Sequence, residues 1–194
     1  FLREDLGLPK NKFILCCFNQ HQRISPTIFS IWMNILKNNS QSVIWLLEDN
    51  ILSKKNLINE AEKKGIEKNR IIFAKRIEIS DHLERIKLAD LFLDTYPYSA
   101  HTTCSDALRS GLPVVTMIGK TFASRVASSL LTTMNLTELI TDTYENYEKL
   151  INNLINDQIL FKNLKEKVKI NSENSILYDS SLFTKNIENA YIDI

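Results

Sequence analysis

The segment 91–116, LFLDTYPYSAHTTCSDALRSGLPVVT, decides the fold. Two short apolar runs, 91–93 and 114–116, enclose a polar loop and a helix whose expected N-cap is Thr102 or Thr103. The runs are too short and too unbroken for half-solvated antiparallel strands, whereas buried parallel strands are apolar throughout. The segment therefore predicts a strand, a helix and a second, parallel strand of one sheet.

The same unit recurs on both sides of this segment. Further apolar runs lie at 13–18, 43–47 and 70–73, with a weaker one at 139–140. The helical patterns between them begin at Ser25-Pro26, at Ser53 and at Ser80-Asp81. This alternation predicts an α/β fold, an open, doubly wound parallel sheet of the Rossmann type.

One domain accounts for the whole chain of 194 residues. The strand pattern predicts that residues 1–143 form the sheet domain. From residue 144 onward the pattern is wholly helical, and the last helix runs through Phe183, Ile187 and Tyr191. Because this region has no strands with which to build a second sheet, residues 144–194 are expected to form a helical tail packed on the same domain.

Composition narrows the classes of partner and the compartment. With 24 Lys+Arg, 23 Asp+Glu and a net charge of +1, the chain carries no bulk charge for binding nucleic acid or an anionic membrane. Cys16, Cys17 and Cys104 form no zinc-ligand pattern, which indicates a reducing, cytoplasmic location and no metal site. Apolar runs stay well below the roughly 18 residues of a membrane span. The first residue is not Met, so we expect a piece of a longer protein.

Ligands of open α/β sheets bind at the carboxyl ends of the strands, which directs attention to the loop after residue 18. This loop lacks the GxGxxG pattern of dinucleotide-binding turns, so NAD and FAD are disfavoured as cofactors. Gln20 and Arg23 are side chains that can hold a phosphate through hydrogen bonds and charge. The alternative is a solvated turn of helix-capping residues.

The loop and helix start at 94–108 carry the clearest chemical pattern. Two adjacent hydroxyl residues, Thr102 and Thr103, stand where free backbone N–H groups and the positive end of a helix dipole converge. This arrangement predicts an anion site for phosphates. His101 can donate to a phosphate oxygen, and Asp106, one turn further, can accept from a sugar hydroxyl. Alternatively, Thr102 merely caps the helix and His101 is a surface turn residue.

Two further segments have both a functional and a structural interpretation. His82 and Arg85 are three residues apart on a predicted helix, so they are neighbours that can stack on or pair with a base; the alternative is a solvated helix face. The triplet Gly119-Lys120-Thr121 resembles part of a P-loop, but the upstream glycine is missing, so a capped turn is expected.

Taken together, these loops resemble the O-GlcNAc transferase-like glycosyltransferases. The resemblance is carried by CFNQ (17–20) with Arg23-Ile24, NRIIF (69–73), His82 with Arg85, LAD (88–90), LDT (93–95), AHTT (100–103), GLPVVT (111–116) and TFASRVA (121–127). It implies the C-terminal catalytic half of a GT-B glycosyltransferase, the half that binds the nucleotide sugar. The expected donor is UDP-GlcNAc, although related enzymes use UDP-glucose or GDP-fucose.

The resemblance also implies roles for individual residues. Gln20 would contact the donor phosphates, His82 would lie against the uracil beside Arg85, and Asp106 would hold the ribose hydroxyls. The diphosphate would bind His101, Thr102 and Thr103. Arg23 stands where the family usually has a lysine that neutralises the leaving diphosphate, which makes it the expected catalytic residue.

The implied reaction is metal-independent transfer of the sugar to a Ser or Thr hydroxyl of an acceptor protein, with inversion at the anomeric carbon. Stabilisation of the departing UDP by a helix N-terminus and a guanidinium fits this scheme, and the chain has no Asp-x-Asp motif. The active site of a GT-B enzyme lies between two domains. We therefore expect an N-terminal catalytic domain and tetratricopeptide repeats in the parent protein, and weak donor binding without turnover by this chain alone. The alternative from another class is a non-catalytic Rossmann-like module for protein association.

Overall fold

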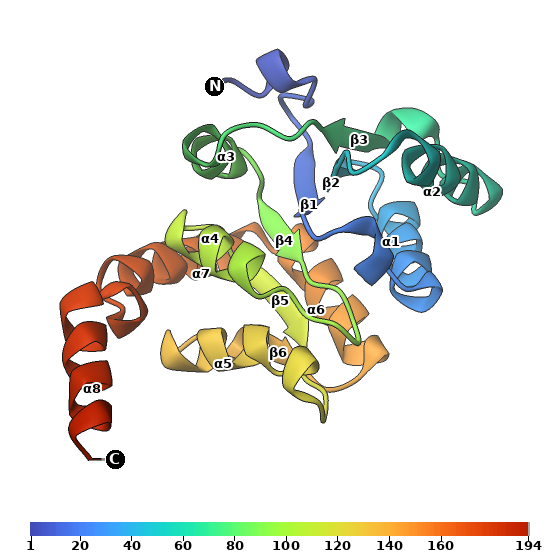
Figure 1. Ribbon diagram of the computed structural model, residues 1–194. Coiled ribbons are helices and arrows are strands. Elements are labelled where there is room, and N and C mark those ends of the chain that lie inside the picture. Colours follow the sequence, from blue (N-terminus) through green and yellow to red (C-terminus); the bar gives the residue numbers. More distant parts are fainter. Residues whose placement is uncertain (194) are drawn as a thin grey trace.

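The computed structural model describes residues 1–193 and contains a six-stranded sheet in the order β3-β2-β1-β4-β5-β6 (Figure 1). All neighbouring strands are parallel. The strands are β1 (Phe13–Cys17), β2 (Ser42–Leu47), β3 (Ile71–Ala74), β4 (Leu91–Leu93), β5 (Val114–Met117) and β6 (Ile140–Thr141). This order reverses between β1 and β4 and confirms the predicted doubly wound sheet.

Helices cover both faces of the sheet. They are α1 (Pro26–Asn38), α2 (Ile51–Lys63), α3 (Ile79–Ile86), α4 (Thr102–Arg109), α5 (Val126–Thr133), α6 (Tyr144–Asn156), α7 (Gln158–Glu173) and α8 (Ser180–Ile192). Right-handed crossovers place α1 and α2 on one face and α3, α4 and α5 on the other, since the chain changes direction across the sheet after β3. Helix α6 packs beside α1, and none of the helices described is long and apolar enough to span a membrane.

The core is built from the strands and the inner faces of these helices. Among its largest fully buried side chains are Trp32, Phe92 and Tyr147. The Trp32 indole N–H donates to the Tyr147 hydroxyl (3.2 Å), which in turn donates to the Asp94 carbonyl oxygen (2.9 Å). Helix α6 is therefore tied both to α1 and to the carboxyl end of β4, where the candidate site lies.

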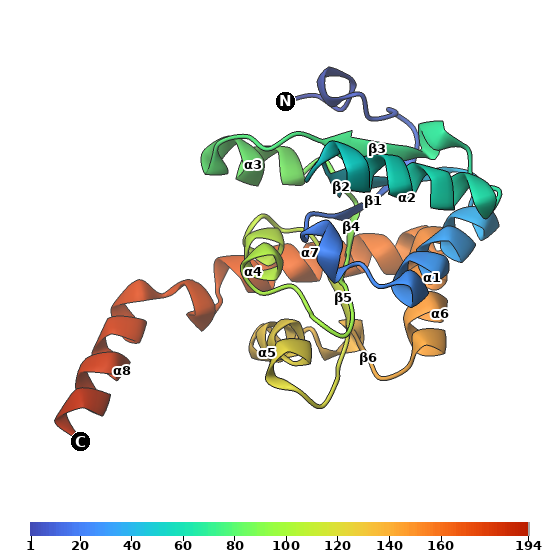
Figure 2. The ribbon, with the colours of Figure 1, turned by 45° about the vertical axis from the view of Figure 1, so that its right-hand side comes forward.

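The last helix differs from the expectation that the whole tail packs on the domain. Helices α6 and α7 bury side chains such as Ile151 and Leu164, but α8 buries none and extends away from the sheet (Figures 1 and 2). Its apolar residues Phe183, Ile187 and Tyr191 are exposed. Helix α8 begins through a local signal, because the Asp179 carboxylate accepts from the Leu182 N–H, and not through burial.

The helix starts follow capping chemistry. The Ser25 hydroxyl accepts from the Ile28 N–H and Pro26 is the first residue of α1, as predicted. For α2, the expected start at Ser53 is wrong: Asn50 is the N-cap, and its side-chain oxygen accepts from the Ser53 N–H (2.8 Å). Asparagine is as good an N-cap as serine, and Asn50 stands three residues before the amide from which it accepts. Helix α3 likewise begins at Ile79, one residue before the expected Ser80-Asp81.

Candidate functional site

The candidate site lies at the carboxyl ends of β1, β4 and β5, where the strand order reverses. Three loops, 18–25, 94–101 and 118–125, meet there. The Ser99 N–H and hydroxyl both donate to the Ala123 carbonyl oxygen (2.9 and 2.7 Å), which joins the second loop to the third. The Ser25 hydroxyl donates to the Tyr96 carbonyl oxygen (3.0 Å), which joins the first loop to the second.

Asp94 organises the loop that follows β4. One carboxylate oxygen accepts from the backbone N–H groups of Thr95 (2.7 Å) and Ala100 (2.6 Å), and the other accepts from the Thr116 hydroxyl (2.6 Å). The side chain is buried, and burial raises the pKa of Asp94 to about 6 in spite of these donors. Asp94 thereby closes the loop on itself and sets the point at which α4 begins.

Asn19 connects this loop to the first. Its amide nitrogen donates to the Thr95 hydroxyl oxygen (2.8 Å) and to the Asp94 carboxylate (3.3 Å), and its amide oxygen accepts from the Thr103 hydroxyl (2.5 Å). Both Asn19 and Asp94 were missed as site residues in the sequence. The signal in the sequence was a polar residue close behind an apolar strand. Such a residue is buried with the strand end, and a buried polar side chain needs hydrogen-bond partners.

The N-terminus of α4 presents free backbone donors. Its N-cap residue is His101, whose side chain makes no capping hydrogen bond, so the expectation that Thr102 or Thr103 caps the helix is wrong. Thr103 lies within the helix, and its hydroxyl donates to the Asn19 side-chain oxygen. Within residues 1–193, the amides of Thr102 and Thr103 donate to no protein group, and the Thr102 side chain is exposed. Two N–H groups at the positive end of a helix make an anion site.

A row of aromatic and cationic side chains borders this anion site. The Arg23 guanidinium carbon lies 4.0 Å from the ring centre of Tyr98, and Arg23 donates to the Ser99 carbonyl oxygen (3.4 Å). The rings of Tyr98 and His101 are stacked with centres 5.0 Å apart, and Phe122 meets His101 edge-on at 5.9 Å. Arg23 and His101, which belong to different loops, are thus brought to one place by Tyr98, a residue that the sequence interpretation did not select.

His82 and Arg85 form a second part of the site on α3. Arg85 is only 3% exposed, and it donates to the Lys75 carbonyl oxygen (2.6 Å) and to Nδ1 of His82 (3.1 Å). The Phe18 ring lies edge-on to His82 at 5.0 Å. Because Arg85 is buried and donates to protein groups, it holds the His82 ring in position. A direct contact of either residue with a base stays a prediction.

Burial, together with the charge of Arg85, lowers the pKa of His82 to about 4. Because Arg85 donates to Nδ1, we expect a neutral ring with its proton on Nε2 at every pH above about 5. Nitrogen-15 NMR of the imidazole checks this: the Nε2–H tautomer should persist from pH 5.5 to pH 8. A transition near pH 6.5 in the wild-type chain would contradict the assignment. In Arg85→Met, the loss of the neighbouring charge should move the protonation of His82 from about pH 4 toward pH 6.5.

In the described part of the chain, no side-chain hydrogen bond ties the other two expected donor-binding residues, Gln20 and Asp106, to another loop of the site. Gln20 is exposed and its side-chain oxygen accepts from the Gln22 amide (2.9 Å). Asp106 lies in the second turn of α4, and partial burial raises its pKa. Its carboxylate makes no hydrogen bond within residues 1–193, so it is available to a ligand. Contacts of both residues with a donor stay predictions.

The segment after β5 is a capped turn, as predicted. Thr121 and Ser124 form a capping box around the 3₁₀ turn η4 (Phe122–Ser124). A Cβ atom at Gly119 would collide with the Ser124 side chain and come within 3.1 Å of the Tyr96 ring, so the close packing of this loop requires glycine. The loop carrying Phe122 is therefore held in a defined position beside His101.

A parallel sheet with an anion site at its switch point is the architecture of proteins that bind nucleotides. The chain belongs to glycosyl transferase family 41, whose family model matches residues 2–187.

Curated relatives and solved structures agree with this family. The chain is 34% identical over 190 residues to the probable UDP-N-acetylglucosamine–peptide N-acetylglucosaminyltransferase SEC of Arabidopsis thaliana, covering 97% of this chain and 19% of the relative. It is 32% identical to the Caenorhabditis elegans UDP-N-acetylglucosamine–peptide N-acetylglucosaminyltransferase, covering 96% of this chain and 16% of the relative. The chain thus spans about a fifth or less of these relatives.

Among solved structures, a mutant of the Thermobaculum terrenum O-GlcNAc transferase superposes with a TM-score of 0.87 at 29% identity, covering 94% of this chain and 36% of that one. Anabaena HepE in complex with UDP and glucose shares the fold, with a TM-score of 0.70 at 18% identity, covering 99% of this chain and 51% of that one.

Proposed function

We propose that this chain is the donor-binding half of a protein O-glycosyltransferase that transfers GlcNAc from UDP-GlcNAc to Ser or Thr hydroxyls of proteins. The observation that carries the proposal is the pair of unpartnered amides at Thr102 and Thr103, bordered by Arg23 and His101. The relatives named for UDP-N-acetylglucosamine support the choice of donor.

The expected roles follow from this geometry. The donor diphosphate binds the two amides, with His101 and Gln20 as side-chain donors. The base lies at His82 and the ribose at Asp106. As the acceptor oxygen attacks the anomeric carbon from the far side, the bond from that carbon to the β-phosphate oxygen breaks and the configuration inverts. Arg23 and the helix dipole stabilise the negative charge that grows on the leaving UDP, so no metal ion is required in this scheme.

A second part of the protein completes the reaction in this proposal. Open α/β sheets bind ligands in a crevice, and here only one wall is present, so the acceptor hydroxyl and its base must come from elsewhere. An N-terminal catalytic domain and tetratricopeptide repeats are the proposed partners, and this chain alone should bind donor weakly without turnover. The buried, unpaired thiols of Cys16, Cys17 and Cys104 support a reducing, cytoplasmic location.

Calorimetric titration with UDP, UDP-GlcNAc, UDP-glucose and GDP-fucose tests the proposal. We expect binding of the UDP compounds that Thr102→Val and His101→Ala each weaken about tenfold, the effect of one lost hydrogen bond to a charged group. Thr27→Val is a matched control, because Thr27 is an exposed threonine in the first turn of α1. Preference for GDP-fucose would contradict the donor assignment. Binding unaffected by any of these variants would contradict the site.

A further inference from the structure

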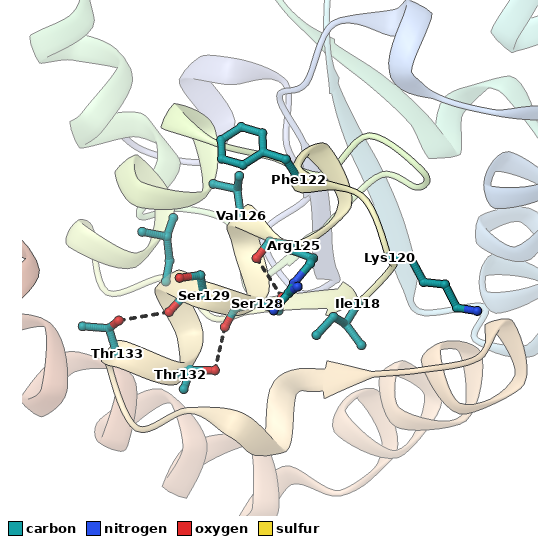
Figure 3. A pocket seen from close by; sticks show the side chains of 10 residues that line it. Ile118, Lys120, Phe122, Arg125, Val126, Ser128, Ser129, Thr132 and Thr133 are labelled. Atoms are coloured by element: carbon teal, nitrogen blue, oxygen red, sulfur yellow. Dashed lines mark hydrogen bonds between the residues drawn. The ribbon is translucent and has the colours of Figure 1, made fainter.

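A hollow on the surface lies outside the proposed donor site. It has a volume of about 730 Å³ and is lined by ten residues of the segment 118–133, which runs from the end of β5 through η4 into α5 (Figure 3). We call it the α5 groove. Ile118 and Phe122 are exposed in it, Phe122 to 80%, and Val126 and Leu130 are the other two apolar residues of its lining. These side chains together form a contiguous apolar lining, and exposed apolar surface that is contiguous marks binding sites more often than singly exposed residues do.

The charge of the α5 groove is of one sign. Lys120 and Arg125 contribute to its lining, and no acidic residue does. In the part of the chain that the structure describes, neither side chain forms an ion pair or a hydrogen bond, although most other groups of this loop are paired. The groove therefore offers an apolar floor with two uncompensated positive charges, which is complementary to an acidic ligand with apolar side chains.

The α5 groove adjoins the donor site. Phe122 contacts the His101 ring edge-on, and the Ala123 carbonyl oxygen accepts from Ser99 in the loop that leads to α4. A segment lying in the groove would therefore pass beside the diphosphate site. Two cations are too few for a nucleic-acid surface, which needs a basic stripe to neutralise several phosphates.

We propose that the α5 groove binds an acidic segment of the acceptor protein, on one side of the serine or threonine that receives the sugar. This inference rests on the proposed function, because it assigns an acceptor preference to the same transfer. Carboxylates of the acceptor would meet Lys120 and Arg125, and an apolar side chain would cover Phe122. A groove of this volume has room for a few side chains.

Fluorescence anisotropy with two serine-containing peptides tests the inference. One peptide carries Asp and Glu next to a Leu, and the other has the matching Asn and Gln. We expect the wild-type chain to bind the acidic peptide about fivefold more tightly than the neutral one, the sum of two exposed ion pairs, and Lys120→Gln/Arg125→Gln to remove this difference. Phe122→Ser should weaken the binding of both peptides to a similar extent, because it removes an apolar contact that salt does not screen. Lys149→Gln/Lys162→Gln removes two exposed cations of α6 and α7 and should change nothing.

The outcomes separate this inference from the proposed function. UDP is titrated into the same variants, and its affinity should stay within about twofold in Lys120→Gln/Arg125→Gln, since neither residue is placed in the donor site. Equal binding of both peptides, or no binding of either, would overturn the acceptor groove even if UDP binds. Peptide binding without any UDP binding would support the α5 groove as a peptide site and overturn the proposed donor site. Self-association in sedimentation velocity that Phe122→Ser abolishes would assign the groove to a second copy of the chain and overturn the inference.

Discussion

Replacing Asp94 by alanine should lower the free energy of unfolding by about 3 to 5 kcal/mol and abolish nucleotide binding. The variant leaves the Thr95 and Ala100 amides and the Thr116 hydroxyl as buried donors without an acceptor, and each such group costs about 1 to 3 kcal/mol. It also releases Asn19 and with it the Thr103 hydroxyl at the start of α4. Urea unfolding and calorimetric titration with UDP measure the two effects.

The isosteric variant Asp94→Asn adds a pH test with a defined sign. The native pKa of about 6 lies above the ordinary value of 3.8, so between these values the native state holds a proton that the unfolded state has lost. The contribution of Asp94 is therefore full below about pH 4 and declines as the pH rises through 6, by up to about 3 kcal/mol. Relative to Asp94→Asn, wild type should be more stable at pH 5 than at pH 7.5. A difference that does not change with pH would contradict this account.

Replacing Thr102 by glutamate should move stability and binding in opposite directions. A carboxylate in the first turn of α4 interacts favourably with the helix dipole and should stabilise the fold by about 0.3 to 1 kcal/mol. The same charge would occupy the proposed diphosphate site, and the repulsion should weaken UDP binding by about a hundredfold or more.

Thr27→Glu is the matched control for this variant. It places the same side chain in the first turn of α1, where it should stabilise the fold similarly and leave UDP affinity unchanged. Thermal unfolding and calorimetric titration are the measurements. If Thr102→Glu bound UDP as tightly as Thr27→Glu does, the start of α4 would not be the phosphate site.

The strands could be predicted because each lies within an unbroken apolar run, which is what burial on both faces of a parallel sheet requires. The ends of β1 to β6 differ from those of the predicted runs by at most one residue. The start of α4 lies one or two residues before the expected one, because His101 and not Thr102 or Thr103 is the N-cap. Two adjacent threonines favour a cap by residue type alone, whereas the structure uses the Thr103 hydroxyl for Asn19.

Those parts of the candidate site that the sequence did not reveal depend on pairs of residues far apart in the chain. Asn19 and Asp94 are 75 positions apart, and Asn19 and Thr103 are 84 apart. The stacking of Arg23 on Tyr98 also joins two loops. Neither periodicity nor capping rules carry information on such contacts. Arg85 was expected beside a base, but its burial and its hydrogen bond to the Lys75 carbonyl oxygen turn it toward the protein.

In the proposed function, the amides at the start of α4 bind the donor diphosphate. Proton–nitrogen NMR of the chain during titration with UDP tests it most directly, because each backbone amide gives its own signal. We expect the Thr102 and Thr103 amide protons to show the largest downfield shifts, because an amide that starts to donate to an anion shifts downfield. Saturable shifts that leave both signals in place and gather on another surface, or no shifts at any UDP concentration, would contradict it.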